Sequence, residues 1–190
     1  NCLLNEVPPD RRVVTCEEVF EIQADLPDMT QMQIREPGLD GSGEITMRYL
    51  VREALRQRPD RIIVGEVRGP EALDLLLALN AGCSGLATVH ANSARESLDK
   101  LVSYCVLAGQ NISVEFVRHT VAMVTDLVVF LRRSGRERRV DEIAAVPTRL
   151  SDDAFTTQTL FRWEEGTLRW TGLRPVDAAD YERAGMEWPA

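Results

Sequence analysis

The strongest constraint on the fold is a short apolar run without alternation, Ile62 to Val64. Such a run is typical of a strand buried on both faces, as in the centre of a parallel sheet covered by helices. Gly65 ends the run, and Glu66 follows where the strand leaves the core. In open α/β sheets, ligands bind beyond the carboxyl ends of the strands. Glu66 is therefore either the end of a strand paired with Arg68, or a group that orients a water or reaches a phosphate-bound metal.

A second strand with a polar end follows in the chain. The stretch Leu86 to Val89 predicts another buried strand, and His90 stands at its end. Ser93 and Glu96 have the Ser-x-x-Glu spacing of a capping box, so His90 lies on a turn between a strand and a helix. A lone histidine is more often structural than catalytic. Its position resembles that of Glu66, however, and a neutral imidazole can hydrogen-bond a γ-phosphate.

Two adjacent carboxylates, Glu17 and Glu18, follow a strand predicted over Arg12 to Cys16. At a strand end they either support a metal or a phosphate-bound water, or are two solvated charges. Solvated charges are the commoner arrangement, so these residues alone do not decide between the two.

A row of arginines lies on the helix predicted over residues 46–58, with Thr46 as its cap. Arg48, Arg52 and Arg56 recur every four residues and therefore share one face of that helix. The face is either solvated or directed at phosphate or a neighbouring subunit, for which guanidinium groups are well suited.

The remaining pattern completes an α/β chain with a β-rich end. Periodicity predicts helices over residues 71–80, 93–107 and 113–125, and strands over 32–35, 126–131, 140–146, 157–163 and 168–171. Residues 132–139 are predicted to form a basic turn.

Composition limits the possible functions. With 30 acidic and 22 basic residues, the chain has a net charge of −8, which argues against nonspecific binding of nucleic acid as its main role. The four cysteines have no Cys-x-x-Cys spacing and form no metal motif with the two histidines. We expect them to be reduced thiols in a cytoplasmic protein. No apolar run approaches the ~20 residues that span a bilayer.

Two segments together resemble a known superfamily. Residues 58–69 read Arg-Pro-Asp-Arg-Ile-Ile-Val-Gly-Glu-Val-Arg-Gly, and residues 87–93 read Ala-Thr-Val-His-Ala-Asn-Ser. They resemble the atypical Walker B element and the His box of the ATPases shared by type II and type IV secretion, most closely the tight-adherence (Flp) pilus branch, also called CpaF or TadA. The resemblance implies a RecA-like P-loop NTPase core, a mostly parallel sheet flanked by helices, incomplete at its N-terminus. It covers residues 1–150 and leaves 151–190 as a C-terminal β-hairpin and tail.

The resemblance also implies a role for each polar residue at the strand ends. Glu66 corresponds to the glutamate that orients the attacking water, and His90 to the His-box histidine. Glu17 and Glu18 lie where the family has its Asp box, with Glu in place of the second acid, and would support Mg²⁺ or water. The arginines that would contact nucleotide phosphates or a neighbouring subunit are Arg52, Arg56 and Arg68, with weaker family support for Arg48.

The family's Gly-rich phosphate loop and N-terminal domain correspond to residues upstream of Asn1. The resemblance therefore implies a portion of a hexameric ATPase that uses ATP and Mg²⁺, with the portion itself binding ATP weakly or not at all. Such a protein powers pilus assembly or secretion through an inner-membrane platform protein, and is cytoplasmic, peripheral to the membrane through its partners. Two alternatives stay open: a conjugative transfer ATPase of the same superfamily, and a scaffold subunit that does not hydrolyse ATP.

Overall fold

The computed structural model describes residues 1–151, 154–175, 178–183 and 185. The chain forms two compact units, which are described separately. The first comprises residues 1–90 and 103–113, and the second comprises residues 91–102 and 114–190. The predicted division at residue 150 stays a prediction.

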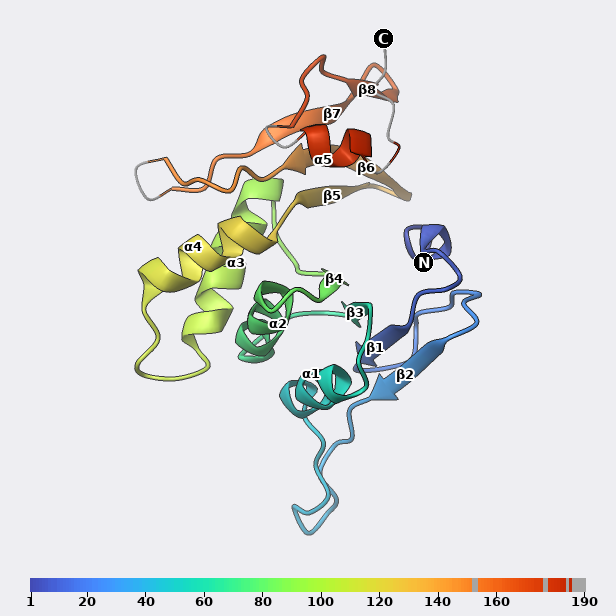
Figure 1. Ribbon diagram of the computed structural model, residues 1–190, viewed down its shortest axis with the longest axis vertical. Helices are drawn as coiled ribbons and strands as arrows, with labels where there is room; N and C mark the ends of the chain where they lie inside the picture. Colours follow the sequence, from blue (N-terminus) through green and yellow to red (C-terminus); the bar gives the residue numbers. More distant parts are fainter. Residues whose placement is uncertain (152–153, 176–177, 184, 186–190) are drawn as a thin grey trace. The chain divides into compact units, whose positions relative to one another are not determined.

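The first unit is built on a parallel sheet (Figure 1). Its strands are β1 (Val13–Glu17), β2 (Met29–Gln33), β3 (Arg61–Val64) and β4 (Ser84–Ala87), in the order β2-β1-β3-β4. All three neighbouring pairs are parallel, as predicted for the central apolar run. β1 is buried at every position, and Ile62, Ile63 and Val64 of β3 are buried as well. Burial of each of these three apolar side chains of β3 stabilises the fold by about 1.5–3 kcal/mol.

Helices α1 (Met47–Arg56) and α2 (Glu71–Asn80) complete this unit with the short 3₁₀ turn η1 (Leu4–Glu6). α1 packs on β1, β2 and β3 and against α2. Thr46 caps α1 as predicted, because its hydroxyl accepts a hydrogen bond of 3.2 Å from the Tyr49 amide.

The register of the sheet aligns the ends of its strands. Cys16 pairs with Val64, and Val64 pairs with Ala87, so β3 and β4 stop at the same level and β1 stops one residue later. The residues that follow each strand therefore emerge along one edge, called here the carboxyl edge.

The second unit contains helix α4 (Val114–Val124), helix α5 (Ala178–Arg183) and an antiparallel sheet. The sheet has the order β5-β6-β7-β8, formed by β5 (Leu127–Ser134), β6 (Glu137–Ala145), β7 (Gln158–Glu164) and β8 (Thr167–Trp170). Helix α3 (Ala94–Val106) is divided between the two units at residue 102. Of the predicted C-terminal tail, residues 176–177, 184 and 186–190 lie outside the described residues.

Three predicted elements differ from the structure. The strand expected over 86–89 is β4, which starts two residues earlier and is mostly exposed, with Leu86 37% exposed. Among the described strands β4 pairs only with β3, so it is an edge strand and not a buried one. The strand expected over 32–35 is β2, shifted toward the N-terminus. The predicted basic turn over 132–139 is also wrong, because β5 continues to Ser134 and β6 begins at Glu137.

Within the described part of the chain, no helix combines the length and the apolar character that crossing a bilayer requires.

Candidate active site at the carboxyl edge of the parallel sheet

Backbone hydrogen bonds hold the carboxyl edge together after the strands end. The Gly65 amide donates to the Cys16 carbonyl at 2.9 Å, and the Val67 amide donates to the Thr88 carbonyl at 2.8 Å. The Thr88 hydroxyl donates to the Gly65 carbonyl at 2.5 Å. A Cβ on Gly65 would lie 3.3 Å from Glu17 Cγ, so glycine allows β1 and β3 to remain close at this point.

The structure brings Glu66 and His90 together at this edge, as the sequence predicted for strand ends of one sheet. His90 Nε2 lies 2.9 Å from Glu66 Oε1, and Arg68 Nη2 lies 2.5 Å from Glu66 Oε2. The Glu66 side chain is 19% exposed, whereas that of His90 is 84% exposed.

Glu66 Oε1 is an unusual atom. It is buried and accepts no hydrogen bond of acceptable geometry within the described residues, despite the short distance to the His90 ring. Rotation of the exposed His90 ring would let a donor such as water reach this oxygen.

Arg68 links two carboxylates of the edge. Besides Glu66, its guanidinium binds Glu18, with Nη1 3.1 Å from Oε2. The hydrogen bond with Glu66 and the negative charge of Glu66 raise the pKa of Arg68 further above its ordinary value. The three side chains form a charged cluster with two acids and one base.

Sequence reasoning missed Glu71, which fixes the turn that carries Arg68. Glu71 Oε1 accepts hydrogen bonds from the backbone amides of Arg68 at 2.6 Å and Gly69 at 2.7 Å, and the side chain is buried. Its position in the first turn of α2, directly after a Gly-Pro pair, is the signal that could have identified it.

Glu17 is placed differently from Glu18. It is 2% exposed, and its carboxylate accepts hydrogen bonds from the Thr15 hydroxyl at 2.7 Å and from the Glu21 and Ile22 amides at 2.8 Å each. These bonds hold the loop that follows β1. The catalytic or metal-supporting role expected for Glu17 stays a prediction.

The arginine row of α1 divides into two groups. Arg48 Nε and Arg52 Nε lie 2.5 Å and 2.7 Å from the two carboxylate oxygens of Asp74 on α2. Arg56 pairs with Glu53 at 3.3 Å, and its side chain is 78% exposed. Among the ion pairs of the described residues, none joins these arginines to Glu66. Sequence reasoning did not identify Asp74, because the pairing depends on how α1 packs against α2.

The carboxylates of the carboxyl edge are compatible with Mg²⁺ that is also bound to phosphate. No group of three or more His, Cys, Asp or Glu side chains in the described residues is arranged to hold a metal ion. The available donors are the carboxylates of Glu66 and Glu18. Mg²⁺ commonly keeps several waters and takes phosphate oxygens with only one or two protein carboxylates, so these donors are compatible with a phosphate-bound ion.

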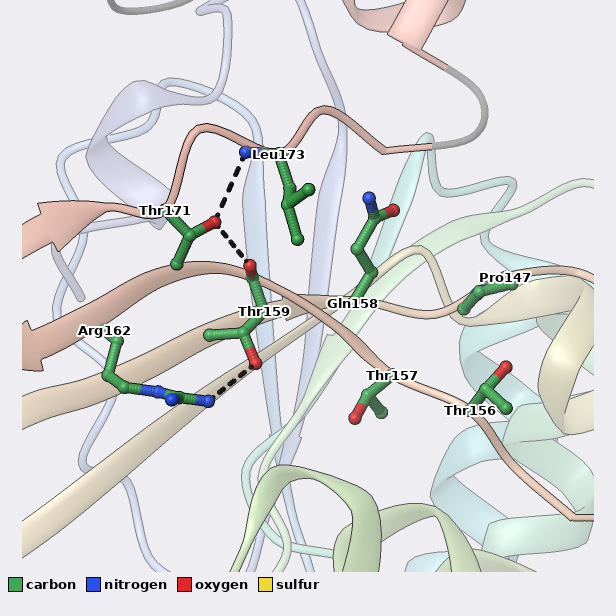
Figure 2. A pocket seen from close by; sticks show the side chains of 8 residues that line it. All are labelled: Pro147, Thr156, Thr157, Gln158, Thr159, Arg162, Thr171 and Leu173. Atoms are coloured by element: carbon green, nitrogen blue, oxygen red, sulfur yellow. Dashed lines mark hydrogen bonds between the residues drawn. The ribbon is translucent and has the colours of Figure 1, made fainter.

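Figure 2 shows a hollow of about 610 Å³ that belongs to the second unit. Half of its lining residues are threonines, and the others are one proline, one glutamine, one arginine and one leucine: Pro147, Thr156, Thr157, Gln158, Thr159, Arg162, Thr171 and Leu173. Several of these groups bond to one another, as Arg162 Nη2 does to the Thr159 hydroxyl at 3.3 Å. None of the described residues that line the hollow carries a carboxylate or an imidazole, and we do not assign the active site to it.

Comparison with known proteins finds a matching family and several relatives. Residues 1–160 match the family model described as Type II/IV secretion system protein. A protein of Mycobacterium tuberculosis named for conjugal transfer is 42% identical over 145 residues, which are 76% of this chain and 41% of that protein. The type IV secretion system protein PtlH of Bordetella pertussis is 35% identical over 150 residues, 75% of this chain and 44% of that protein. The chain thus spans about two fifths of the length of the curated relatives it matches.

Two solved structures are similar as well. The VirB11 ATPase of the Brucella suis type IV secretion system, in complex with sulphate, matches with a TM-score of 0.66 and 26% identity over 76% of this chain and 43% of that chain. The pilus retraction motor PilT with bound ADP matches with a TM-score of 0.51 and 26% identity over 75% of this chain and 39% of that chain. These matches confirm the predicted α/β fold with a parallel sheet flanked by helices.

Proposed function

Because the chain belongs to the type II/IV secretion system protein family, we propose that it is the part of an ATPase that positions water for hydrolysis of ATP. The observation that carries this proposal is the pairing of Glu66 with His90 at the end of neighbouring parallel strands. Phosphoryl transfer depends mainly on positioning and on charge stabilisation, and this edge supplies groups for both.

Glu66 is the residue that we assign to the attacking water. Its Oε1 accepts no hydrogen bond of acceptable geometry within the described residues and lies 2.9 Å from the His90 ring, so it can accept one from a water once that ring turns away. Arg68 keeps Oε2 occupied and the carboxylate oriented, at 2.5 Å. His90, mostly exposed, would turn from Glu66 toward a phosphate and report its presence.

The positively charged groups would stabilise charge on the transferring phosphoryl group. Arg56 is exposed and, among the described residues, its ion pair is with Glu53 on its own helix, so it can reach a phosphate or another subunit. Arg52 would have to leave Asp74 to do the same. For Arg68 the contact with Glu18 is the more exposed of its two ion pairs and the easier one to exchange.

Mg²⁺, when bound with ATP, would neutralise phosphate charge, with Glu66 and Glu18 as the nearest carboxylates of this chain. Glu17, whose oxygens are already bonded, would act by holding the loop that carries Glu18. We propose that the Gly-rich phosphate loop belongs to a part of the longer protein outside this chain, since the match covers only 41% and 44% of the two relatives' length.

The intact protein is proposed to be a cytoplasmic homo-hexamer that acts on an inner-membrane platform protein, as the resemblance to the CpaF/TadA branch implies. Its work would be pilus assembly or protein secretion. Conjugative transfer is the second candidate, and the names of the M. tuberculosis relative and of TrbB from Rhizobium radiobacter, 36% identical over 147 residues, favour it. The Glu66–His90 pair argues against a scaffold that does not hydrolyse ATP.

Calorimetric titration with Mg-ATP tests the assignment of the phosphate loop. The 190-residue chain should bind weakly or not at all, whereas the longer protein should bind in the micromolar range. Micromolar binding by the chain alone would show that its own residues hold the phosphates and would refute that assignment.

A further inference from the structure

The longest hairpin of the antiparallel sheet extends beyond its neighbours. β5 pairs with β6 from Leu127 to Ser134, but the pairing of β6 with β7 covers only Glu142 to Ala145. Residues 131–141 therefore form a two-stranded arm that ends in a turn at Gly135 and Arg136 (Figure 1). This β5–β6 arm holds five arginines and two carboxylates, a net charge of +3 in a chain whose net charge is −8.

On one face of the arm the arginines are neutralised. Arg132 and Arg139 are directly opposite each other, and both bind Asp141, with Nε to carboxylate distances of 2.7 Å and 3.2 Å. Burial alone would raise the pKa of Asp141, but hydrogen bonds from the two arginines lower it below its ordinary value. Arg139 also lies over the Trp163 ring, 5.0 Å from its centre.

On the other face the arginines have no such partner. Arg133 and Arg138 are also directly opposite, and the next pair toward the sheet is Leu131 with Val140. Within the described residues no carboxylate pairs with Arg133, Arg138 or Arg136, all of which are exposed, and Leu131 is 64% exposed. Like charges directly opposite each other on a sheet repel, so this arrangement is unfavourable until an anion is present.

These four residues, Leu131, Arg133, Arg136 and Arg138, are called the exposed arginine cluster. We propose that this cluster rests on an anionic lipid bilayer. The guanidinium groups contact headgroup phosphates, and Leu131 enters the boundary between headgroups and acyl chains. The inference does not depend on ATP hydrolysis by the protein.

Two observations favour a bilayer over other anions. The cluster joins three cations to an exposed apolar side chain, and a bilayer surface accommodates both kinds of group. Single-stranded nucleic acid, by contrast, is bound with aromatic side chains that stack on bases, and the cluster has none. Because the rest of the chain is strongly acidic, an anionic bilayer would repel it and would attract mainly the arm.

Vesicle flotation of the 190-residue chain tests the proposal, with vesicles of 30% phosphatidylglycerol in phosphatidylcholine compared with pure phosphatidylcholine at low salt. The chain should float with the anionic vesicles only. Replacing Arg133, Arg136 and Arg138 by Ser together should lower the partition coefficient roughly a hundredfold, and replacing all three by Lys should keep most of the binding.

A matched variant controls for net charge. Arg149, Arg169 and Arg174 are three other exposed arginines of the same unit. Replacing all three by Ser removes the same charge and should lower binding by less than about threefold. Leu131→Ser should weaken binding several-fold, whereas Leu107→Ser, at a residue of similar exposure, should leave it unchanged. Circular dichroism of each variant verifies that it is folded.

Four results would overturn the proposal. The first is an equal loss of vesicle binding in the two triple variants, and the second is equal flotation of the chain with neutral and anionic vesicles. The third is binding of the cluster to duplex DNA without binding to vesicles. The fourth is self-association of the chain that the cluster variant abolishes, in the absence of vesicle binding.

Discussion

Removal of the Asp74 carboxylate tests whether α2 holds the arginines of α1 in solution. The side chain of Asp74 is only 9% exposed, and its two oxygens bind Arg48 and Arg52 separately. Asp74→Ala therefore breaks two charge-assisted contacts at once and leaves two guanidinium groups beside an apolar methyl.

The expected cost follows from the exposure of each partner. A hydrogen bond to a charged group contributes about 1.5–3 kcal/mol, and the contact with Arg48, whose side chain is 32% exposed, falls near the middle of that range. The Arg52 side chain is 57% exposed, so solvent screening limits its contact to about 1 kcal/mol or less. Asp74→Ala should thus lower the free energy of unfolding by about 3 kcal/mol.

Urea unfolding followed by far-UV circular dichroism measures this loss, which should shift the midpoint by about 1 M or more. Double-mutant cycles with Arg48→Ala and Arg52→Ala divide it, and the coupling of Asp74 with Arg48 should exceed that with Arg52 by about 1 kcal/mol. A total loss under 1 kcal/mol, or equal coupling to the two arginines, would show that the arginines are not held as the structure has them.

Two further predictions concern the first unit. Burial raises the pKa of Cys16 and of Cys105 to about 12, with smaller contributions from nearby carboxylates. Both thiols therefore stay protonated at pH 8 and should resist iodoacetamide in the native chain, while the exposed Cys2 should react. Mass spectrometry of the labelled peptides measures which cysteines have reacted. Thr46→Ala should lower the free energy of unfolding by about 1 kcal/mol. Thr46→Ser should lower it by much less, since serine keeps the hydroxyl that caps α1. The same loss of unfolding free energy in both variants would contradict the capping role.

The parallel sheet and its carboxyl edge could be predicted because their signals are local. A run such as Ile62 to Val64 has few alternatives to a doubly buried strand, and a polar residue directly after such a strand must emerge at its carboxyl end. Two strands of one parallel sheet then place Glu66 and His90 near each other, and the 2.9 Å distance agrees.

What could not be predicted depends on side-chain packing between distant segments. The burial of Glu17, next to the more exposed Glu18, results from a loop that turns its amides toward β1. Glu71 accepts a hydrogen bond from the Arg68 amide, and Asp74 forms an ion pair with Arg48. Both contacts likewise form only when α2 is packed in its place. Periodicity locates such residues on a helix but does not show which partner a carboxylate will find.

The sequence of the arm in the second unit predicts a turn where the structure has two strands, for a related reason. Its arginine-rich sequence has the charge typical of a loop, and only the pairing of Arg133 with Arg138 shows that the strands continue. Strand propensity is decided by neighbours across the sheet, which a single sequence does not reveal.

The central claim is that Glu66 positions the attacking water, and steady-state ATP hydrolysis by the longer protein with Glu66→Gln tests it most directly. An amide retains the shape of the side chain but loses its negative charge, so hydrolysis should be abolished while Mg-ATP binding, measured by calorimetry, stays close to that of the unmodified protein. Unchanged hydrolysis in the Gln variant would remove Glu66 from the chemistry and contradict the account.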